Sequence, residues 1–204
     1  MPHKPSPGPV SAEDRAHRHA RLLDAALNEF ITFGYAAANL DRIAETAGIS
    51  KMTIYRQVGE KEQLFQLTTE AAIAAISVEL AELMGRLPPL AEMVRAFVDL
   101  VRKRINSREH GLLRLAIAER RSFPDLSDRL LERVEALYQP MIDYLHEVAG
   151  GRLSLEQVRR QTLMLQAMAT GGSLALLGLS EAEADPWADD ACALFLRGFD
   201  SDRP

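Results

Sequence analysis

The sequence predicts an all-α fold of about nine helices: an N-terminal helix-turn-helix module of three helices, followed by a larger C-terminal helical domain. Three observations predict it. From Ser11 onward apolar residues recur at helical spacing almost everywhere, no segment of four or more residues alternates as a strand does, and glycine and proline separate the periodic stretches. Of the 204 residues, 47% are hydrophobic and 26% charged, which is typical of a globular protein with a sizeable core.

We expect three segments in the chain. Residues 1–10 carry proline at alternate positions from Pro2 to Pro9, which propagates neither helix nor strand, and we expect a disordered leader there. Residues 11–66 form the helix-turn-helix domain and residues 67–204 form the second domain.

The first helix is expected over 11–33. Ser11 precedes Glu13 and Asp14, as a helix N-terminus requires, and Gly34 ends the pattern. The apolar residues at helical spacing are Leu22, Leu23, Ala26, Leu27, Phe30 and Phe33.

Two short helices follow. Asn39 is an N-cap residue for a helix over 40–47, and Gly48 ends that helix. Ser50 then caps a second helix over 51–58, which buries Ile54 and Val58.

A longer helix is expected over 60–84, ending before Gly85 and the Pro88–Pro89 pair. Pro124, Gly150–Gly151 and Asp185–Pro186 mark boundaries further on, and Pro140 should kink or divide the segment that contains it. The later helical segments are 90–106, 109–122, 125–149, 154–178 and 186–198.

Charge and cysteine content limit the partners and the location. The formal charge is -5, yet residues 1–61 carry +1 and the remainder -6, so a local basic patch is compatible with an acidic chain. The single cysteine, Cys192, excludes an internal disulfide and a multi-cysteine zinc site, and it lies in an apolar stretch. No apolar run approaches the ~20 residues that span a bilayer, and the first ten residues lack the apolar core of a signal peptide. We therefore expect a cytoplasmic protein with no membrane partner.

Residues 40–57, LDRIAETAGISKMTIYRQ, have the features of a helix-turn-helix. That motif needs a small residue where its helices cross, a turn residue that adopts positive φ, and apolar residues that fix the second helix. Ala44, Gly48 and the set Ile43, Ile49 and Ile54 supply these.

The polar face of the second helix is suited to DNA. Arg56 can bond guanine O6 and N7, Gln57 can bond adenine N6 and N7, and the Thr53 methyl can meet a thymine methyl. Tyr55 and Lys61 are better suited to phosphates. The candidate DNA-binding residues are Asn39, Lys51, Met52, Thr53, Tyr55, Arg56, Gln57 and Lys61. By itself the pattern also fits a tight helical hairpin with a solvated polar face.

About fifty N-terminal residues resemble the TetR family of transcriptional regulators. The matching residues are Leu22–Ala26, Phe30, Phe33–Tyr35, Leu40, Ile43–Ala44, Ala47–Ser50, Ile54–Tyr55, Lys61–Glu62 and Leu64–Phe65. The segment 115–131 is similar to the AcrR- and AefR-like branches of that family. Met52, Gln57, Val58 and Gly59–Glu60 depart from the usual pattern, so no relative's operator sequence can be transferred to this chain.

The resemblance implies a homodimeric repressor that binds a palindromic double-stranded DNA operator and is released by a small, moderately hydrophobic effector, with no cofactor and no metal. Residues 67–204 would be the ligand-sensing and dimerisation domain. The candidate ligand-binding residues are Phe97, His110, Leu113, Arg114, Ile117, Phe123, Tyr138, Met141, Tyr144, Met164 and Met168. The candidate dimer-interface residues are Leu163, Gly171, Gly172, Leu174, Leu177, Cys192 and Phe195. The ligand set also fits an ordinary core, and the interface set also fits the core of a monomer.

Catalysis is not expected. His146–Glu147 lacks the second histidine of a zincin, and the sequence has no GxSxG, P-loop or dinucleotide-binding glycine motif. A transcriptional activator and a helical interaction module that binds no DNA remain as alternatives.

Overall fold

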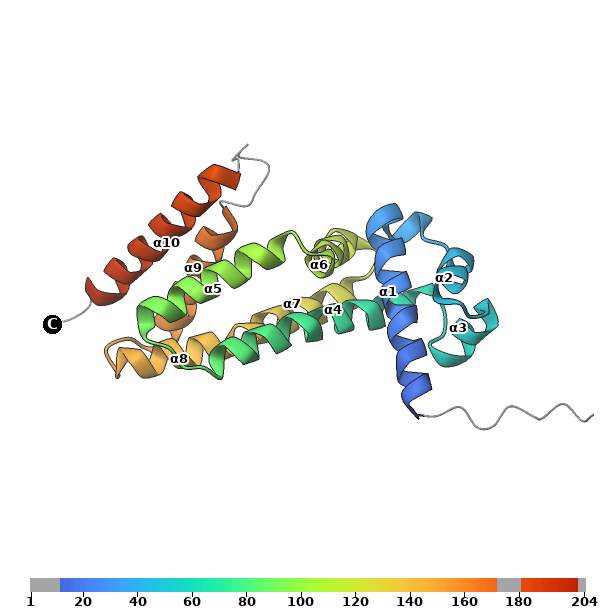
Figure 1. The fold of residues 1–204 in the computed structure, drawn as a ribbon, viewed down its shortest axis with the longest axis horizontal. Helices are drawn as coiled ribbons and strands as arrows, with labels where there is room; N and C mark the ends of the chain where they lie inside the picture. Colours follow the sequence, from blue (N-terminus) through green and yellow to red (C-terminus); the bar gives the residue numbers. More distant parts are fainter. Residues whose placement is uncertain (1–11, 172–180, 202–204) are drawn as a thin grey trace, which may run out of the picture. The chain divides into compact units, whose positions relative to one another are not determined.

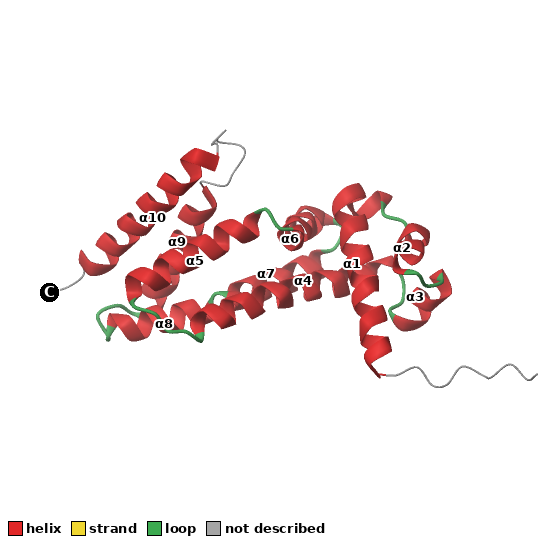
Figure 2. Cartoon of the chain, viewed as in Figure 1, coloured by secondary structure: helices red, strands yellow, loops and turns green. Residues whose placement is uncertain are grey.

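The computed structural model describes residues 12–171 and 181–201, and within them it is helical, with no strand (Figures 1 and 2). The predicted all-α class is confirmed. The leader expected over residues 1–10 lies outside the described residues. Contacts divide the chain into two compact units, residues 1–71 and 72–204, called unit 1 and unit 2 below.

Unit 1 contains three complete helices and the start of a fourth. They are α1 (Ala12–Ala37), α2 (Leu40–Ala47), α3 (Lys51–Gln57) and the first part of α4 (Lys61–Met84). The expected end of the first helix at Gly34 corresponds to a kink, because Gly34 adopts φ 73° and ψ 168° inside α1 and a short helical segment continues beyond it. Glycine adopts this conformation without a Cβ clash.

The core of unit 1 is an aromatic cluster with aliphatic residues around it. Phe30 on α1 is fully buried and meets Phe65 on α4 edge to face, with ring centroids 4.9 Å apart. Tyr35 lies 5.0 Å from Phe65. The fully buried Ile43 and Ile54 bring α2 and α3 into the same core, so the two short helices depend on tertiary packing as well as on their caps.

Unit 2 holds the rest of α4 and seven further elements. They are α5 (Leu90–Ile105), α6 (Arg108–Ala118), the 3-10 turn η1 (Glu119–Arg121), α7 (Pro124–Leu137), α8 (Gln139–Ala149), α9 (Leu155–Gly171) and α10 (Glu181–Ser201). The division predicted near Pro140 is confirmed, since α7 ends at Leu137 and α8 begins at Gln139. This division turns the nine predicted helices into ten in the described residues.

The boundary predicted at Asp185–Pro186 is wrong. The helix α10 begins at Glu181 and contains Pro186. Because this proline lies near the N-terminal end, it removes one intrahelical hydrogen bond and the helix continues. The helix expected over 154–178 is described as α9 up to Gly171, and the remainder lies outside the described residues.

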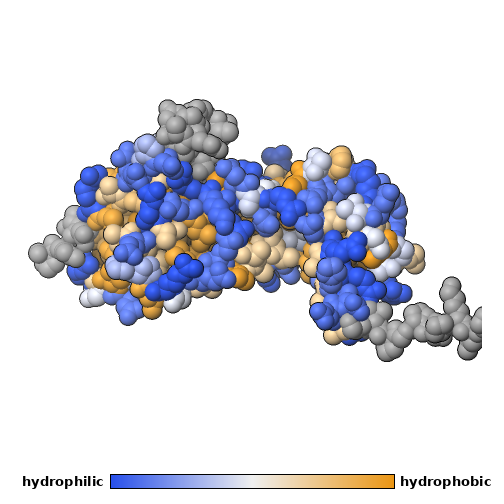
Figure 3. Space-filling model, viewed as in Figure 1, coloured by the Kyte–Doolittle hydropathy of each residue, from blue (hydrophilic) through white to orange (hydrophobic). Residues whose placement is uncertain are grey.

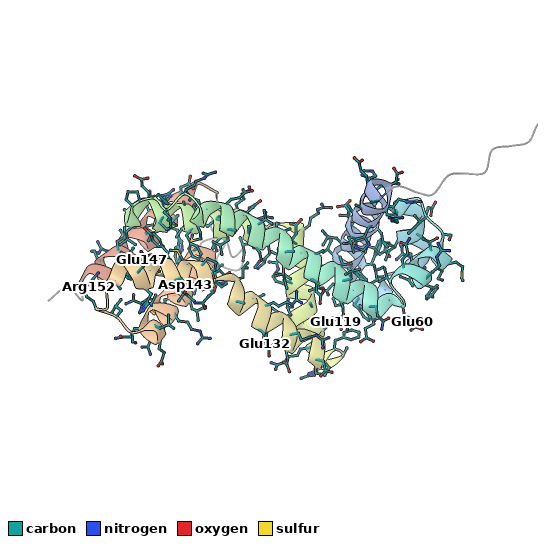
Figure 4. All side chains as sticks on the ribbon, turned by 90° about the horizontal axis from the view of Figure 1, so that it is seen from below. Glu60, Glu119, Glu132, Asp143, Glu147 and Arg152 are labelled. Atoms are coloured by element: carbon teal, nitrogen blue, oxygen red, sulfur yellow. The ribbon has the colours of Figure 1, made fainter. Side chains whose placement is uncertain are left out.

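Buried apolar residues of α5 hold unit 2 together, because α5 packs against α6, α9 and α10. Phe97 and Val98 are fully buried there. Ion pairs from Arg95 to Asp189 and from Arg102 to Asp185 also join α5 to α10. Figure 3 shows hydrophobic residues interspersed with polar ones on the face of unit 2 in view. The exposed side of α8 carries Asp143 and Glu147, labelled in Figure 4.

One described helix, α4, is long and apolar enough to cross a membrane by length and composition. Its apolar residues serve the cores of the protein instead: Leu64 and Phe65 are fully buried, and Ile73, Ile76 and Leu80 are buried as well. A buried core helix passes the same test of hydropathy.

Candidate nucleic-acid interface and effector cavity

The turn between α2 and α3 is fixed by hydrogen bonds at both ends. Asn39 is the N-cap of α2, and its side-chain oxygen accepts a hydrogen bond from the Asp41 N–H at 2.7 Å. Gly48 ends α2 at φ 68°, with its N–H on the Glu45 carbonyl and the Ile49 N–H on the Ala44 carbonyl. Ser50 begins α3, and its hydroxyl accepts the Thr53 N–H at 3.2 Å. These three cap predictions are confirmed, and they orient α3 against α2.

The two faces of α3 differ. Ile54 is fully buried, whereas Met52 is 73% exposed and Tyr55, Arg56 and Gln57 are also exposed. Val58, expected in the buried face, is half-buried at the C-cap. The polar face therefore lies where the sequence predicted it.

Two of the predicted contact residues already have partners. The Lys51 ammonium lies 2.9 Å from an Asp41 carboxylate oxygen, and this hydrogen bond raises the pKa of Lys51. The Thr53 hydroxyl lies 2.9 Å from the Ser50 hydroxyl. By contrast, the side chains of Arg56 and Gln57 have no hydrogen-bond or ion-pair partner in the part of the chain that the structure describes. Arg56 and Gln57 are thus the α3 side chains best placed to bond a ligand without breaking an internal contact.

Lys61 makes internal contacts at the end of α1. Its ammonium donates to the Ala36 carbonyl at 3.1 Å and to the Ala38 carbonyl at 3.2 Å, and it lies 4.8 Å from the centre of the Tyr35 ring. These carbonyls follow the Gly34 kink. The structure therefore gives Lys61 a role in holding the end of α1, and its phosphate contact stays a prediction.

An ion pair joins α1 to α2. The Glu29 carboxylate is 8% exposed and accepts hydrogen bonds from the Arg42 guanidinium and from the Asn39 N–H, the latter at 2.9 Å. Burial alone would raise the pKa of Glu29, but these hydrogen bonds and the Arg42 charge outweigh it, so the pKa is below its ordinary value. Arg42 also donates to the Ala37 carbonyl and lies 4.4 Å from the Phe33 ring centre. Sequence reasoning missed this pair, although an acidic residue beside Phe30 on the apolar side of the helix was a signal for it.

A basic side chain of α1 lies against the turn. A Cβ added to Gly48 would be 2.8 Å from the Arg21 Nη2 atom, so the Arg21 guanidinium covers this glycine. Arg15, Arg18 and Arg21 are all on the exposed first half of α1. They add positive charge to unit 1 next to the helix-turn-helix.

Unit 2 encloses a cavity of about 80 Å³ lined by α4, α5, α6, α7, Tyr138 and α9. Four predicted ligand residues lie in its wall: Phe97, His110, Leu113 and Tyr138. The wall residues that sequence reasoning missed are Ile76, Leu80, Leu100, Val101, Arg104, Ile105, Val134, Leu137, Gln166 and Thr170. The helical period marks the inward faces of such helices, but only their tertiary arrangement shows which inward residues border the cavity.

The other seven ligand candidates lie outside this wall. Met141 is in the fully buried core, Ile117 and Met164 are largely exposed, and Arg114 is exposed. The Tyr144 hydroxyl donates to the Pro88 carbonyl at 2.8 Å. Phe123 and Met168 are half-buried elsewhere, and the Met168 carbonyl accepts the Trp187 N–H at 2.6 Å. These seven residues do not line this cavity, and a ligand contact at any of them stays a prediction.

The candidate dimer-interface residues differ in their exposure. Cys192 and Phe195 are buried within the chain, where Phe195 stacks on Phe199, and burial raises the pKa of the Cys192 thiol. Gly171 admits Trp187, because an added Cβ would lie 3.1 Å from that ring. Gly172, Leu174 and Leu177 lie outside the described residues. Among the described candidates, Leu163 is exposed, beside Met164 in a shallow hollow of α9.

A capped turn followed by a short helix with an exposed polar face has the geometry of a helix-turn-helix. Residues 22–68 match the model of the bacterial regulatory proteins of the tetR family. Residues 22–68, about a quarter of the chain, therefore have the sequence of a tetR-family N-terminal region. The N-terminal resemblance predicted from the sequence is thereby confirmed.

Curated relatives match part of the chain. The chain is 41% identical over 56 residues to the HTH-type transcriptional repressor AcnR of Corynebacterium jeikeium, covering 28% of this chain and 30% of the relative. It is 31% identical over 91 residues to the HTH-type transcriptional activator FasR of Mycolicibacterium smegmatis, covering 43% of this chain and 42% of the relative. The chain thus spans less than half the length of these relatives, which are regulators and not enzymes.

Solved structures share this fold over most of the chain. A TetR-family transcriptional regulator from Mesorhizobium loti has a TM-score of 0.73 at 22% identity, covering 89% of this chain and 96% of that one. FadR from Bacillus subtilis in complex with stearoyl-CoA has a TM-score of 0.65 at 15% identity, covering 88% and 98%. At these identities the likeness shows the fold alone.

Proposed function

We propose that the protein is a cytoplasmic, ligand-responsive transcriptional regulator: a homodimeric repressor that binds a palindromic operator and is released by a small, moderately hydrophobic effector. The observation that carries the proposal is the exposed face of α3. Arg56 and Gln57 lie on the exposed face of a helix that is held in place by its caps and by the buried Ile54. Neither side chain has a hydrogen-bond or ion-pair partner in the described residues. Side chains of these types read guanine and adenine edges in a major groove.

The first test is selection of bound DNA from a random pool by the purified protein at physiological salt, followed by sequencing. We expect an enriched palindrome whose half-sites lie about one helical turn, ~34 Å, apart. On that operator Arg56→Ala should lose about 1–3 kcal/mol of discrimination at one base position. Arg129→Ala, which removes an exposed arginine of α7, is the matched control and should retain full binding.

Two results would contradict the DNA-binding proposal. One is a folded dimer that enriches no sequence. The other is equal affinity of Arg56→Ala and the unchanged protein for specific and random DNA. Either would favour the helical interaction module.

The dimer interface is proposed on α9 and α10. Four apolar side chains are exposed on these helices: Leu155, Leu163 and Met164 of α9 and Leu194 of α10. Large exposed apolar patches are rare on monomers and mark interaction sites. A two-fold axis would then pair two copies of α3. Sedimentation of Leu163→Glu should show a monomer with weakened operator binding, whereas an unchanged dimer would place the interface elsewhere.

The proposed route from effector to operator is α4, which runs without interruption from Lys61, the residue that holds the end of α1, to residues Ile76 and Leu80 of the cavity wall. A ligand shifts operator affinity only if it favours one of two conformations. Equal effector affinity for free and operator-bound protein would rule this route out. Activation is the second candidate, because the relative FasR is an activator, and reporter expression with the operator in place separates the two.

A further inference from the structure

The polar groups of the unit 2 cavity indicate which ligands it can bind. We propose that the cavity takes an uncharged molecule with a compact apolar body and one hydroxyl or carbonyl group, and that it excludes carboxylates and ammonium ions. This inference rests on the proposed effector site. The cavity's size, the contacts of Arg104 and three polar side chains without hydrogen-bond partners support it.

The cavity is small and its walls are largely apolar. Its volume is about 80 Å³, and it is lined by Phe97 and by aliphatic residues of α4, α5, α6 and α7. A dry cavity of about 150 Å³ binds benzene, so one six-membered ring would already press on these walls. A compact ligand therefore fills the site, and its entry displaces wall helices, including α4.

The arginine in the cavity wall is already paired with two carboxylates. Arg104 is 16% exposed, and its guanidinium contacts both oxygens of Glu79, with its Nε atom donating at 2.7 Å. A second carboxylate, Glu109, lies 3.7 Å from its Nη1 atom. Hydrogen bonds and nearby arginines outweigh the effect of burial and keep the pKa of Glu109 below its ordinary value, so the Glu109 carboxylate is ionised at pH 7. An anionic ligand near Arg104 would therefore lie close to the carboxylates of Glu79 and Glu109, which would repel it.

Three other wall side chains can bond a ligand. The His110 imidazole, the Tyr138 hydroxyl and the Gln166 amide come from different elements, and none has a hydrogen-bond partner among residues 12–171 and 181–201. Each of the three can both donate and accept. They match a hydroxyl or carbonyl group, and hydrogen bonds of this kind fix the orientation of a ligand in an apolar site.

These groups are neutral at pH 7. Burial, assisted by the charge of Arg114, lowers the pKa of His110, and burial raises the pKa of Tyr138 to about 12. A charged ligand would leave water for an apolar site without a free counter-ion, which is unfavourable. An uncharged ligand avoids that loss.

Four probes with the same ring test the inference: benzyl alcohol, benzoate, benzylammonium and toluene. Calorimetry on the full-length protein at pH 7 should show saturable binding of benzyl alcohol, with benzoate and benzylammonium at least about tenfold weaker because their charges are unpaired. Toluene should also be weaker, by about three- to tenfold, because the polar wall groups stay unpaired. Tyr138→Phe should bring benzyl alcohol down to the level of toluene. Tyr144→Phe, which removes a hydroxyl outside the cavity, is the matched control and should bind as the unchanged protein does.

Replacement of the two acidic partners of Arg104 is the second experiment. The double substitution Glu79→Gln with Glu109→Gln frees the guanidinium, so benzoate should now bind at least about tenfold better than before. Circular dichroism at each step confirms that the variants are folded.

Three results would overturn the inference: benzoate binding as tightly as benzyl alcohol, no saturable binding of benzyl alcohol by the folded protein up to about 10 mM, or no effect of Tyr138→Phe. The proposed function fails separately. If benzyl alcohol binds selectively but leaves operator affinity unchanged, the inference on ligand class holds and the cavity is not the release site.

Discussion

Unit 1 and unit 2 are both helical, but different interactions position their functional side chains. In unit 1, short-range polar contacts fix each element: Asn39 and Ser50 cap the two short helices, and Glu29 ties α1 to α2. In unit 2, apolar packing surrounds a cavity where the side chains of His110, Tyr138 and Gln166 have no hydrogen-bond partner in the described part of the chain. The same helical architecture thus presents a surface fixed by short-range polar contacts in one unit and an apolar cavity with unbonded polar groups in the other.

The largest expected effect contrasts two buried phenylalanines. Phe30→Ala should lower the free energy of unfolding by about 3–5 kcal/mol, because its ring is surrounded by Phe65, Tyr35 and other core residues. Phe97→Ala should cost less, since its ring already borders a cavity and loses fewer contacts. Denaturant unfolding followed by circular dichroism measures both.

The exposed Phe33 on the same helix as Phe30 provides the control, and Phe33→Ala should lose no more than about 1 kcal/mol. A loss for Phe97→Ala as large as that for Phe30→Ala would show that the two cores are equally tight, and the contrast between the units would fail.

Two glycines give an intermediate effect of opposite sign. Gly34→Ala should destabilise unit 1 by about 1–3 kcal/mol, because φ 73° with ψ 168° is a conformation that only glycine adopts readily. Gly198→Ala should stabilise α10 by about 0.4–1 kcal/mol, because an added Cβ there meets no atom within 4 Å and alanine favours the helix. Thermal melting of the two variants checks the signs. A stabilising Gly34→Ala would mean that the kink in α1 is not required.

The smallest effect is a difference in pH dependence. The pKa of His110 is lowered in the folded protein, so its contribution to stability is present above the ordinary histidine pKa of about 6.5 and is lost as the pH falls below it. Glu29 also has a lowered pKa, but its contribution is lost only below the ordinary carboxyl pKa of about 4.3. Unit 2 should therefore begin to lose stability at a higher pH than unit 1.

The fluorescence of Trp187, the single tryptophan, reports on unit 2, and melting followed through it between pH 7 and pH 5 measures the first loss. His110→Gln should remove that dependence, whereas Glu29→Gln should leave it and change only the more acidic range. If Glu29→Gln alters melting between pH 7 and pH 5, the assignment is wrong.

The sequence by itself determined the all-α class, the caps at Asn39 and Ser50, the positive φ of Gly48 and the exposed face of α3. These features depend on neighbours within four residues, and local spacing expresses them directly. The division at Pro140 is of the same kind. Tertiary structure decided which residues meet across helices: the Glu29–Arg42 pair, the contacts of Lys61 with the end of α1, and the wall of the cavity, of which Arg104 and Gln166 are members that no local pattern distinguishes from other half-buried helical positions. It also decided that Cys192 and Phe195 pack within the chain. The helical period shows only that a residue faces inward, because it carries no information on which distant helix lies opposite.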